Sequence, residues 1–414
     1  MSSNETPLRI LFISHDGGMA GAQTVLGTLL KGLNRTRFSP HLVVPDEGPL
    51  AELAAGCGVP VTRRELIHWI PCVSNMRESR RWRQAYRVLT SLRTRAWAVA
   101  QLIERYEIDL VYTNTVTCVE GAIAARMTNR PHIWHIHEPI AGNSELLQLL
   151  PEWAYVRSIH RLSSQVIFPS EALARDYPML SDIGSVVHNG LTLPPPRDRD
   201  VCRAEVAGQL GIDASKNWVA VVGALQPRKD HRTFLAAAAV VMKQNTNVHF
   251  VIVGSGAEYY KQSLHAQIEA MGLTHHVTLT GRWEGPIATI LNAIDILAIT
   301  SEQESFGLTA IEAMAVETPV VATRCGGPEE IIDNGKNGIL VDVNDGESMA
   351  RAILNLLNNT SMRTMLGQAG HDKVHLCFSE DKFVRAIEVI MANVVAQSAG
   401  PSGQILVTSP RSER

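Results

Sequence analysis

Residues 296–327 read ILAITSEQESFGLTAIEAMAVETPVVATRCGG, and this stretch decides which fold the chain adopts. Residues 296–300 and 319–323 are short apolar runs, which predict buried strands. The segment between them predicts a helix that begins near Gly307, and two glycines follow the second strand. A strand, a helix and a second strand in this order indicate a parallel sheet, in which ligands bind beyond the carboxyl ends of the strands.

The same order of elements occurs in both halves of the chain. Residues 8–14 predict a strand that is followed by a glycine-containing loop at 17–21 and by helical periodicity over 24–33. Further strands that end in glycine or small polar residues are expected at 218–222, 248–253 and 277–280. We therefore predict an α/β protein with two Rossmann-like, doubly wound domains that face a central cleft.

The clearest linker is PPPRDRD at residues 194–200. It separates an expected N-terminal domain over 1–193 from an expected C-terminal domain over 201–375. A terminal helix is expected over 376–398, with a return to the first domain as an open alternative. Residues 399–414 are expected to form a flexible tail.

Composition excludes several classes of protein. The chain has 414 residues, of which 45% are hydrophobic and 19% charged, and its net charge of −3 argues against nucleic-acid binding. Its six cysteines show no C-x-x-C spacing, which fits a reducing compartment rather than a zinc site or a disulfide framework. We find no signal peptide and no 18-residue apolar window, and therefore expect a cytoplasmic protein.

Residues 77–105 are rich in arginine and have the pattern of an amphipathic helix. One interpretation is a helix that covers the sheet and turns its arginines to solvent. The other is contact with an anionic membrane surface, because basic amphipathic helices bind such surfaces. The expected apolar stripe consists of Trp82, Tyr86, Leu89, Ala96, Ala100 and Ile103.

Two glutamates, Glu304 and Glu312, carry the strongest chemical signal. Glu304 lies in the loop after a predicted strand, and Glu312 is expected about two turns into the next helix. A helix start suits a phosphate, and carboxylates accept hydrogen bonds from sugar hydroxyls and a ribose diol. By themselves, two glutamates at this spacing also fit a purely structural role, in which one lies at the N-terminus of a helix and the other is exposed to solvent.

Residues 301–342, which include this pair, resemble the C-terminal signature of the retaining family-4 glycosyltransferases with the GT-B fold. The resemblance extends to GALQPRK at 223–229, VGSG at 253–256, HNG at 188–190, FPSE at 168–171 and AGAQ at 20–23. It implies that Glu304 contacts the donor sugar and Glu312 the nucleotide ribose. The backbone amides of residues 306–308 would hold the diphosphate. The donor-binding residues implied in this loop are Ser305, Phe306, Gly307 and Leu308.

The resemblance also implies a cationic site for the diphosphate. Lys229 would neutralise it, whereas the arginine that usually stands five residues earlier is Ala224 in this chain. Whether Arg228 compensates for that loss is left open. Gly21 would approach the reacting phosphate or the acceptor, and His137 would lie near the donor sugar as a catalytic residue. Among the neighbours of His137, the preferred interpretation of His135 is a packed side chain.

No metal and no cofactor are required on this hypothesis. The D-x-D sequence at 198–200 lies in the linker without a strand before it, so it is interpreted as solvated charge. Arg228 and Lys229 would stabilise the leaving diphosphate in place of a metal ion, and attack on the same face as the leaving group would retain the configuration.

The predicted activity is transfer of a hexose from a UDP-sugar, or else from GDP-mannose, to a hydroxyl of a glycan, a lipid-linked glycan or a small molecule. Envelope polysaccharide synthesis is the expected setting. The alternatives are a sugar-nucleotide epimerase, a phosphorylase, a nicotinamide-dependent oxidoreductase and a non-catalytic sugar-nucleotide binder. The first loop lacks the G-x-G-x-x-G spacing of dinucleotide-binding proteins, which disfavours the oxidoreductase.

Overall fold

The computed structural model describes residues 6–71, 78–143, 146–195 and 197–398, with the backbone alone at 78–85, 88 and 89. The chain divides into two compact units. The first comprises the chain up to Pro169, residues 174–190 and the C-terminal segment from Asp381. The second comprises residues 170–173 and 191–380, and each unit is described by itself below.

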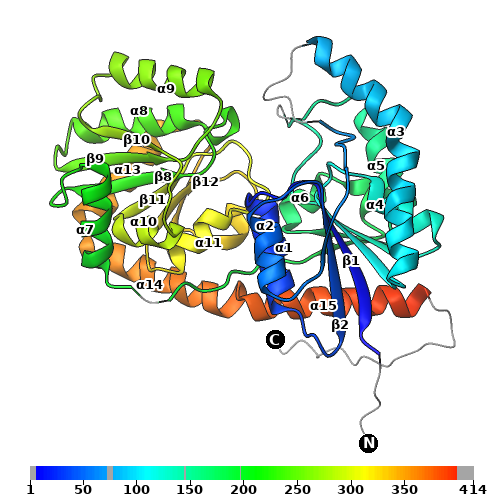
Figure 1. The fold of residues 1–414 in the computed structure, drawn as a ribbon. Helices are drawn as coiled ribbons and strands as arrows, with labels where there is room; N and C mark the ends of the chain where they lie inside the picture. Colours follow the sequence, from blue (N-terminus) through cyan, green and yellow to red (C-terminus); the bar gives the residue numbers. More distant parts are fainter. Residues whose placement is uncertain (1–5, 72–77, 144–145, 196, 399–414) are drawn as a thin grey trace, which may run out of the picture. The chain divides into compact units, whose positions relative to one another are not determined.

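In its described residues, the first unit contains a seven-stranded parallel sheet with the order β3-β2-β1-β4-β5-β6-β7 (Figure 1). The strands are β1 (Leu8–Ser14), β2 (Phe38–Val44), β3 (Val61–Arg63), β4 (Leu110–Asn114), β5 (His132–His135), β6 (Gln165–Phe168) and β7 (Gly184–Val186). The helical segments are α1 (Gly21–Gly32), α2 (Pro49–Gly56), α3 (Glu78–Arg105), α4 (Glu120–Met127), α5 (Glu152–Leu162), η1 (Pro178–Leu180) and α15 (Glu380–Ser398), and α6 (Glu171–Arg175) lies where the two units meet in sequence. The strand order reverses between β1 and β4, which is where ligands bind in doubly wound sheets.

The described part of the second unit has a six-stranded parallel sheet with the order β10-β9-β8-β11-β12-β13. The strands are β8 (Asn217–Val222), β9 (Val248–Val253), β10 (Val277–Gly281), β11 (Ile296–Ile299), β12 (Val320–Thr323) and β13 (Ile339–Val341). The helical segments are α7 (Arg199–Leu210), η2 (Pro227–Lys229), α8 (His231–Met242), α9 (Glu258–Ala270), α10 (Ile287–Ala293), α11 (Leu308–Met314), α12 (Pro328–Ile331), α13 (Gly346–Asn358) and α14 (Thr360–Cys377). Here the strand order reverses between β8 and β11.

Alternate side chains of the strands in the second unit pack on opposite faces of the sheet. Val219 and Val221 of β8 join one buried cluster with residues of α8, α9 and α13. Trp218 and Ala220 join a second cluster with residues of α7, α10 and α11. Because successive side chains of a strand point to opposite faces, a fully apolar strand needs helices on both sides. The predicted α/β class with two Rossmann-like, doubly wound domains is confirmed.

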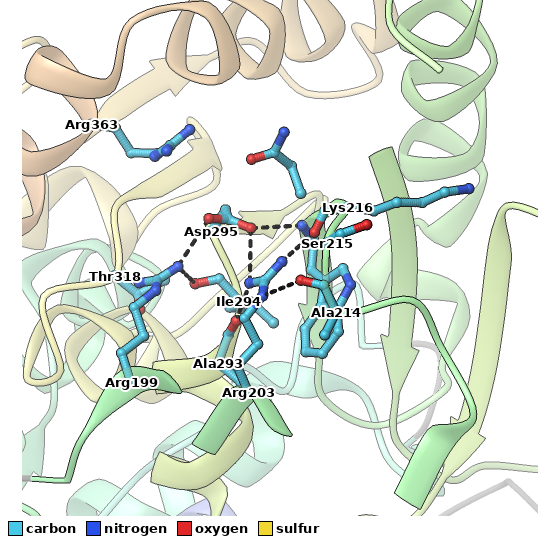
Figure 2. Close-up of polar contacts among 12 residues, drawn as sticks. Arg199, Arg203, Ala214, Ser215, Lys216, Ala293, Ile294, Asp295, Thr318 and Arg363 are labelled. Carbon is cyan, nitrogen blue, oxygen red and sulfur yellow. Dashed lines mark hydrogen bonds and ion pairs between the residues drawn. The ribbon is translucent and has the colours of Figure 1, made fainter. Parts of the chain in front are cut away.

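An ion-pair network fixes α7 to the edge of this sheet where the strands begin (Figure 2). Asp295, just before β11, accepts from Trp218 N at 2.8 Å and pairs with Arg199 at 3.0 Å and Arg203 at 3.1 Å. The Arg203 guanidinium also lies 4.2 Å from the centroid of the Trp218 ring. Helix α7 begins at Arg199, inside the segment expected to be a linker, and Asp198 caps it by accepting from Val201 N. Arg199 of the D-x-D sequence is therefore held in an ion pair, while Asp198 and Asp200 are exposed.

The arginine-rich helix α3 differs from the expectation in two respects. Ala96, Ala100 and Ile103 are buried as predicted for the stripe, but Tyr86 is 70% exposed, so the buried stripe does not extend to that residue. Arg95 was expected among the solvated arginines but is 5% exposed, because it forms an ion pair with Glu120 at 2.8 Å. Arg77 and the side chains of residues 78–85, which carry much of the predicted positive charge, lie outside the described residues.

Helix α15, red in Figure 1, belongs to the first unit from Asp381 onward. Its buried Glu388 accepts a hydrogen bond from Asn34 N at 2.7 Å and lies 3.6 Å from the Arg37 guanidinium. The predicted tail at 399–414 lies outside the described residues. In the part of the chain that is described, no helix combines the length and the apolar character needed to cross a membrane.

Removal of Glu120 tests the buried pair. Glu120→Ala should lower the free energy of unfolding of the first unit by about 3–5 kcal/mol, because Arg95 would stay buried without its partner. The backbone amide of Ile67, which donates to Glu120 at 3.0 Å, would also lose its acceptor. The matched control is Glu65→Ala, which breaks the exposed pair with Arg87 on the same helix and should cost less than about 1 kcal/mol. Equal losses in urea denaturation of the two variants would contradict this account.

Candidate active site

A buried carboxylate with two cations lies beyond the carboxyl ends of the strands in the second unit. The Lys229 ammonium forms an ion pair with Glu304, and the Arg228 guanidinium lies 3.9 Å from the second carboxylate oxygen. The Ser301 hydroxyl donates to Glu304 Oε1 at 2.7 Å. Glu304 and Lys229 are mostly buried, with side chains 12% and 19% exposed. The structure thus brings together three of the predicted site residues.

Backbone hydrogen bonds fix the loop that carries Glu304. Its amide donates to Cys325 O at 2.9 Å, and its carbonyl accepts from Gly327 N at 2.9 Å, so the loop lies along the segment after β12. On the other side, Glu302 N donates to Arg228 O at 2.9 Å and the Thr300 hydroxyl donates to Lys229 O at 2.8 Å. The ends of β8, β11 and β12 therefore position one carboxylate and two cations together.

Electrostatics keeps Glu304 ionised. Burial alone would raise the pKa of this carboxyl group, but the charges of Lys229 and then Arg228 outweigh it and lower the pKa. One carboxylate, Glu304, thus faces two basic side chains, Lys229 and Arg228. Such a site favours an anionic ligand such as a diphosphate, provided that the ligand reaches the cations.

Two glycines allow the backbone segments around this site to approach closely. A Cβ atom on Gly254 would lie 1.7 Å from Gly223 O, and one on Gly327 would lie 2.2 Å from Phe306. Gly307, with φ +107°, leads into α11 in a conformation that favours glycine. Ala224, at the position where the resemblance implies an arginine, is exposed.

Glu312 lies on α11, which has seven residues and begins at Leu308. Glu312 is therefore about one turn into this helix, and not two turns as expected. Burial raises its pKa to about 7, so near neutral pH it exchanges between the carboxylate and the neutral acid. Between the two glutamates, the Ser305 carbonyl accepts from the Ser170 hydroxyl, and the Phe306 ring packs 5.7 Å from the Phe378 ring. The Phe306 side chain is thus buried in the core.

The predicted residues His137 and Gly21 belong to the first unit. His137, two residues after β5, has its Nε2 atom 2.8 Å from Asn114 Oδ1 and its ring 4.0 Å from the ring of His135. Burial, followed by the nearby His15, lowers the pKa of His137 to about 3, so its imidazole is neutral at neutral pH. Gly21 is the exposed first residue of α1.

Three polar residues near His137 were not among the predicted site residues. His15 follows β1, Thr115 follows β4, and Gln23 lies in the first turns of α1. Their position after adjacent strands is the signal that could have identified them, because β1 and β4 flank the reversal of strand order. In the described ranges, no group of three or more His, Cys, Asp and Glu side chains is arranged to hold a metal ion.

Two family models match the chain, one in each half. Residues 19–193 match the model described as Glycosyltransferase Family 4, and residues 203–373 match Glycosyl transferases group 1. A D-inositol 3-phosphate glycosyltransferase of Segniliparus rotundus is 36% identical over 42% of this chain and 39% of that protein. The lipopolysaccharide core biosynthesis glycosyltransferase LpsE of Rhizobium meliloti is 31% identical over 45% of this chain and 52% of its own length. The matches therefore span about half or less of these relatives.

Solved structures resemble the whole chain. Alr3699/HepE of Anabaena, in complex with UDP and glucose, has a TM-score of 0.76 at 23% identity and covers 93% of this chain and 99% of its own. Sucrose-phosphate synthase of Thermosynechococcus elongatus has a TM-score of 0.72 at 18% identity, with 94% and 100% covered. At these identities the likeness shows the fold.

Buried neutral histidines make the first unit sensitive to acid. Burial lowers the pKa of His132 from its ordinary value of 6.5 to about 3. Between these two pH values the unfolded chain binds a proton on this side chain that the folded chain does not bind. The free energy of unfolding should therefore fall as the pH falls, by about 2 kcal/mol for this group between pH 7 and pH 5. His132→Asn should reduce the difference in urea-unfolding free energy between the two pH values by that amount. The control is His160→Asn, at an exposed histidine of α5, which should keep most of the difference in unfolding free energy between pH 7 and pH 5. If His132→Asn kept the full difference as well, buried His132 would not be its cause.

Proposed function

Because the chain belongs to the family-4 glycosyltransferases with the GT-B fold, we propose that it transfers a hexose from a nucleotide-diphosphate sugar to a hydroxyl group with retention of anomeric configuration. The observation that carries this proposal is the fixed cluster of Glu304, Lys229 and Arg228 at the carboxyl edge of a doubly wound sheet. A UDP-sugar is the first choice of donor and GDP-mannose the second. UDP and glucose in the HepE complex support that order.

We assign the donor-binding roles to the second unit. Lys229 and Arg228 bind the diphosphate together with the backbone amides of residues 306–308, beside Ser305. Glu304 accepts hydrogen bonds from the sugar hydroxyls, and Glu312 holds the ribose diol. The Lys229 ammonium is paired with Glu304, and we propose that it moves toward the diphosphate when the donor binds.

The proposed reaction breaks the bond between the anomeric carbon of the sugar and the diphosphate oxygen. Fixed cations stabilise the negative charge that develops on the leaving oxygen, and this role needs no metal ion and no cofactor. The acceptor oxygen forms the new bond on the same face, and the leaving phosphate takes its proton. His137 is proposed to act in its neutral form as a hydrogen-bonding group for a substrate hydroxyl, and Gly21 to let the backbone of its loop approach the substrate.

The acceptor is proposed to be a hydroxyl of a glycan, a lipid-linked glycan or a small molecule in polysaccharide biosynthesis. We place the enzyme in the cytoplasm, with reversible attachment to an anionic membrane surface through α3. The exposed Tyr86 and Trp97 of this arginine-rich helix support such contact, since aromatic side chains favour membrane interfaces. Flotation with anionic vesicles at rising salt concentration would test the attachment.

A sugar-nucleotide epimerase or a non-catalytic binder is the alternative function. Release of UDP that requires an acceptor distinguishes the transferase from both.

Glu304→Ala should reduce kcat/KM for transfer by at least about 10²-fold, because the donor sugar would lose the carboxylate that orients it. Binding of UDP, which lacks the sugar, should not weaken, since the substitution removes a negative charge. Glu302→Ala removes an exposed carboxylate two residues away and serves as the control. Near-normal transfer by Glu304→Ala would exclude the assigned role.

Lys229→Ala should weaken UDP binding by about tenfold or more, because a charge-assisted contact to the diphosphate contributes roughly 1.5–3 kcal/mol. Calorimetric titration measures the change directly. Lys336→Ala removes an exposed lysine of the same unit and should leave the affinity unaltered. If Lys229→Ala bound UDP as tightly as the wild type, the lysine would be only the partner of Glu304.

A further inference from the structure

Two histidines one turn apart on α14 bring their imidazole rings together. Residues 371–375 read HDKVH, and side chains four positions apart lie on the same face of a helix. The Nε2 atoms of His371 and His375 are 3.0 Å apart, and the ring centroids are 4.3 Å apart. A contact of this length between two ring nitrogens has one proton between them, because one nitrogen donates and the other accepts. Both Nε2 atoms are therefore directed at the same point.

This point is accessible from solvent, while the backbone that carries the two rings is fixed. His375 is exposed, and the side chain of His371 is 32% exposed. Val374, between them, is buried in the hydrophobic core of the second unit. The Lys373 ammonium donates to Asp333 Oδ2 at 2.8 Å, which ties the same turn to the segment before β13. Ligands that the fold already holds in place lose little conformational freedom when they bind.

Asp372 favours the tautomer of His371 that a metal ion requires. Its Oδ1 atom lies 3.7 Å from Nδ1 of His371. This distance is too long for a hydrogen bond, but the negative charge attracts the ring proton to Nδ1 and leaves the lone pair of Nε2 for a metal. Histidines that bind metal ions commonly direct their other ring nitrogen at a carboxylate in this way.

We propose that His371 and His375 chelate one divalent transition-metal ion through their Nε2 atoms. Imidazole nitrogen suits Cu²⁺, Ni²⁺ and Zn²⁺, whereas Mg²⁺ and Ca²⁺ prefer oxygen ligands. With metal–nitrogen bonds of about 2.0–2.1 Å, nitrogen atoms 3.0 Å apart form an angle of about 95° at the metal. This is close to the right angle of tetragonal and octahedral coordination, so the pair favours Cu²⁺ and Ni²⁺ over tetrahedral Zn²⁺.

The site is separate from the proposed transfer reaction. Helix α14 carries none of the proposed donor-binding residues, and that reaction needs no metal ion. Among the described residues, no third His, Cys, Asp or Glu side chain joins the pair in a metal-binding group, so water fills the remaining coordination positions. The bound ion bridges the last two turns of α14 and thereby stabilises the helix before it ends at Cys377.

Calorimetric titration of the EDTA-treated, dialysed full chain with NiCl₂ tests the site. His371→Asn and His375→Asn should each raise the Kd for Ni²⁺ at least about tenfold, because each variant keeps one of the two ligands and even the loss of a partner outside the ligand shell costs about 10–100-fold. The control is His265→Asn, at an exposed histidine of α9 in the same unit, which should bind as the wild type does. Absence of Ni²⁺ binding to the wild type, or an unchanged Kd in His371→Asn and His375→Asn, would refute the site.

A second measurement locates the ion without relying on affinity. Cu²⁺ added below one equivalent should broaden the imidazole NMR signals of His371 and His375 before those of His265 and His160. Zn²⁺ should bind more weakly than Ni²⁺, and excess Mg²⁺ should not displace Ni²⁺. Broadening that begins at other histidines, or tighter binding of Zn²⁺ than of Ni²⁺, would contradict the proposal. Transfer by His375→Asn in the presence of EDTA should equal that of the wild type, and a loss there would show that the pair is not separate from the transfer site.

Discussion

The site in the second unit depends on the ion pairing of one buried acid, Glu304, with Lys229 and Arg228. Burial of this carboxyl group raises its pKa, while the charges of Lys229 and Arg228, together with hydrogen bonds from Lys229 and Ser301, lower it below the usual value. The three residues come from the segments after β8 and β11, and the loop after β12 fixes the backbone of Glu304. Adjacent parallel strands are what bring these segments to one edge. Glycines such as Gly254 then permit backbone contacts that any Cβ atom would prevent.

The opposite edge of the same sheet shows how a structural charge cluster differs. Asp295 is also held by two cations, but its other contacts are to the backbone, and Arg203 donates to the carbonyl groups of Ala214 and Ala293 as well. Donors and acceptors there are matched within the protein, which fastens α7 to the sheet. Both clusters set one carboxylate against two basic side chains, so the charge count does not separate them. Their position does: the Glu304 cluster lies at the carboxyl ends of the strands, where doubly wound sheets bind ligands, whereas the Asp295 network at the other edge stabilises the fold.

Local patterns in the sequence were sufficient for the strands, the doubly wound class and the loop that carries Glu304, because apolar runs followed by glycine depend on neighbouring residues alone. They did not predict that Arg95 is buried, since its partner Glu120 lies on another helix. They placed the start of α11 correctly near Gly307, but Glu312 is about one turn and not two turns into that helix, because five residues after Gly307 make only about 1.4 turns. The conformation of Thr115 could not be predicted from its residue type, which normally avoids positive φ. Long-range contacts impose the burial of Arg95 and the conformation of Thr115.

The proposed mechanism depends most on Lys229, which changes partner from Glu304 to the donor diphosphate. A crystal structure of the protein with UDP bound tests it most directly. We predict a diphosphate between the Lys229 ammonium and the backbone amides of residues 306–308, with the contact between Lys229 and Glu304 lengthened and Glu304 turned to the position of the absent sugar. UDP bound elsewhere, with the Lys229–Glu304 ion pair intact, would contradict the claim.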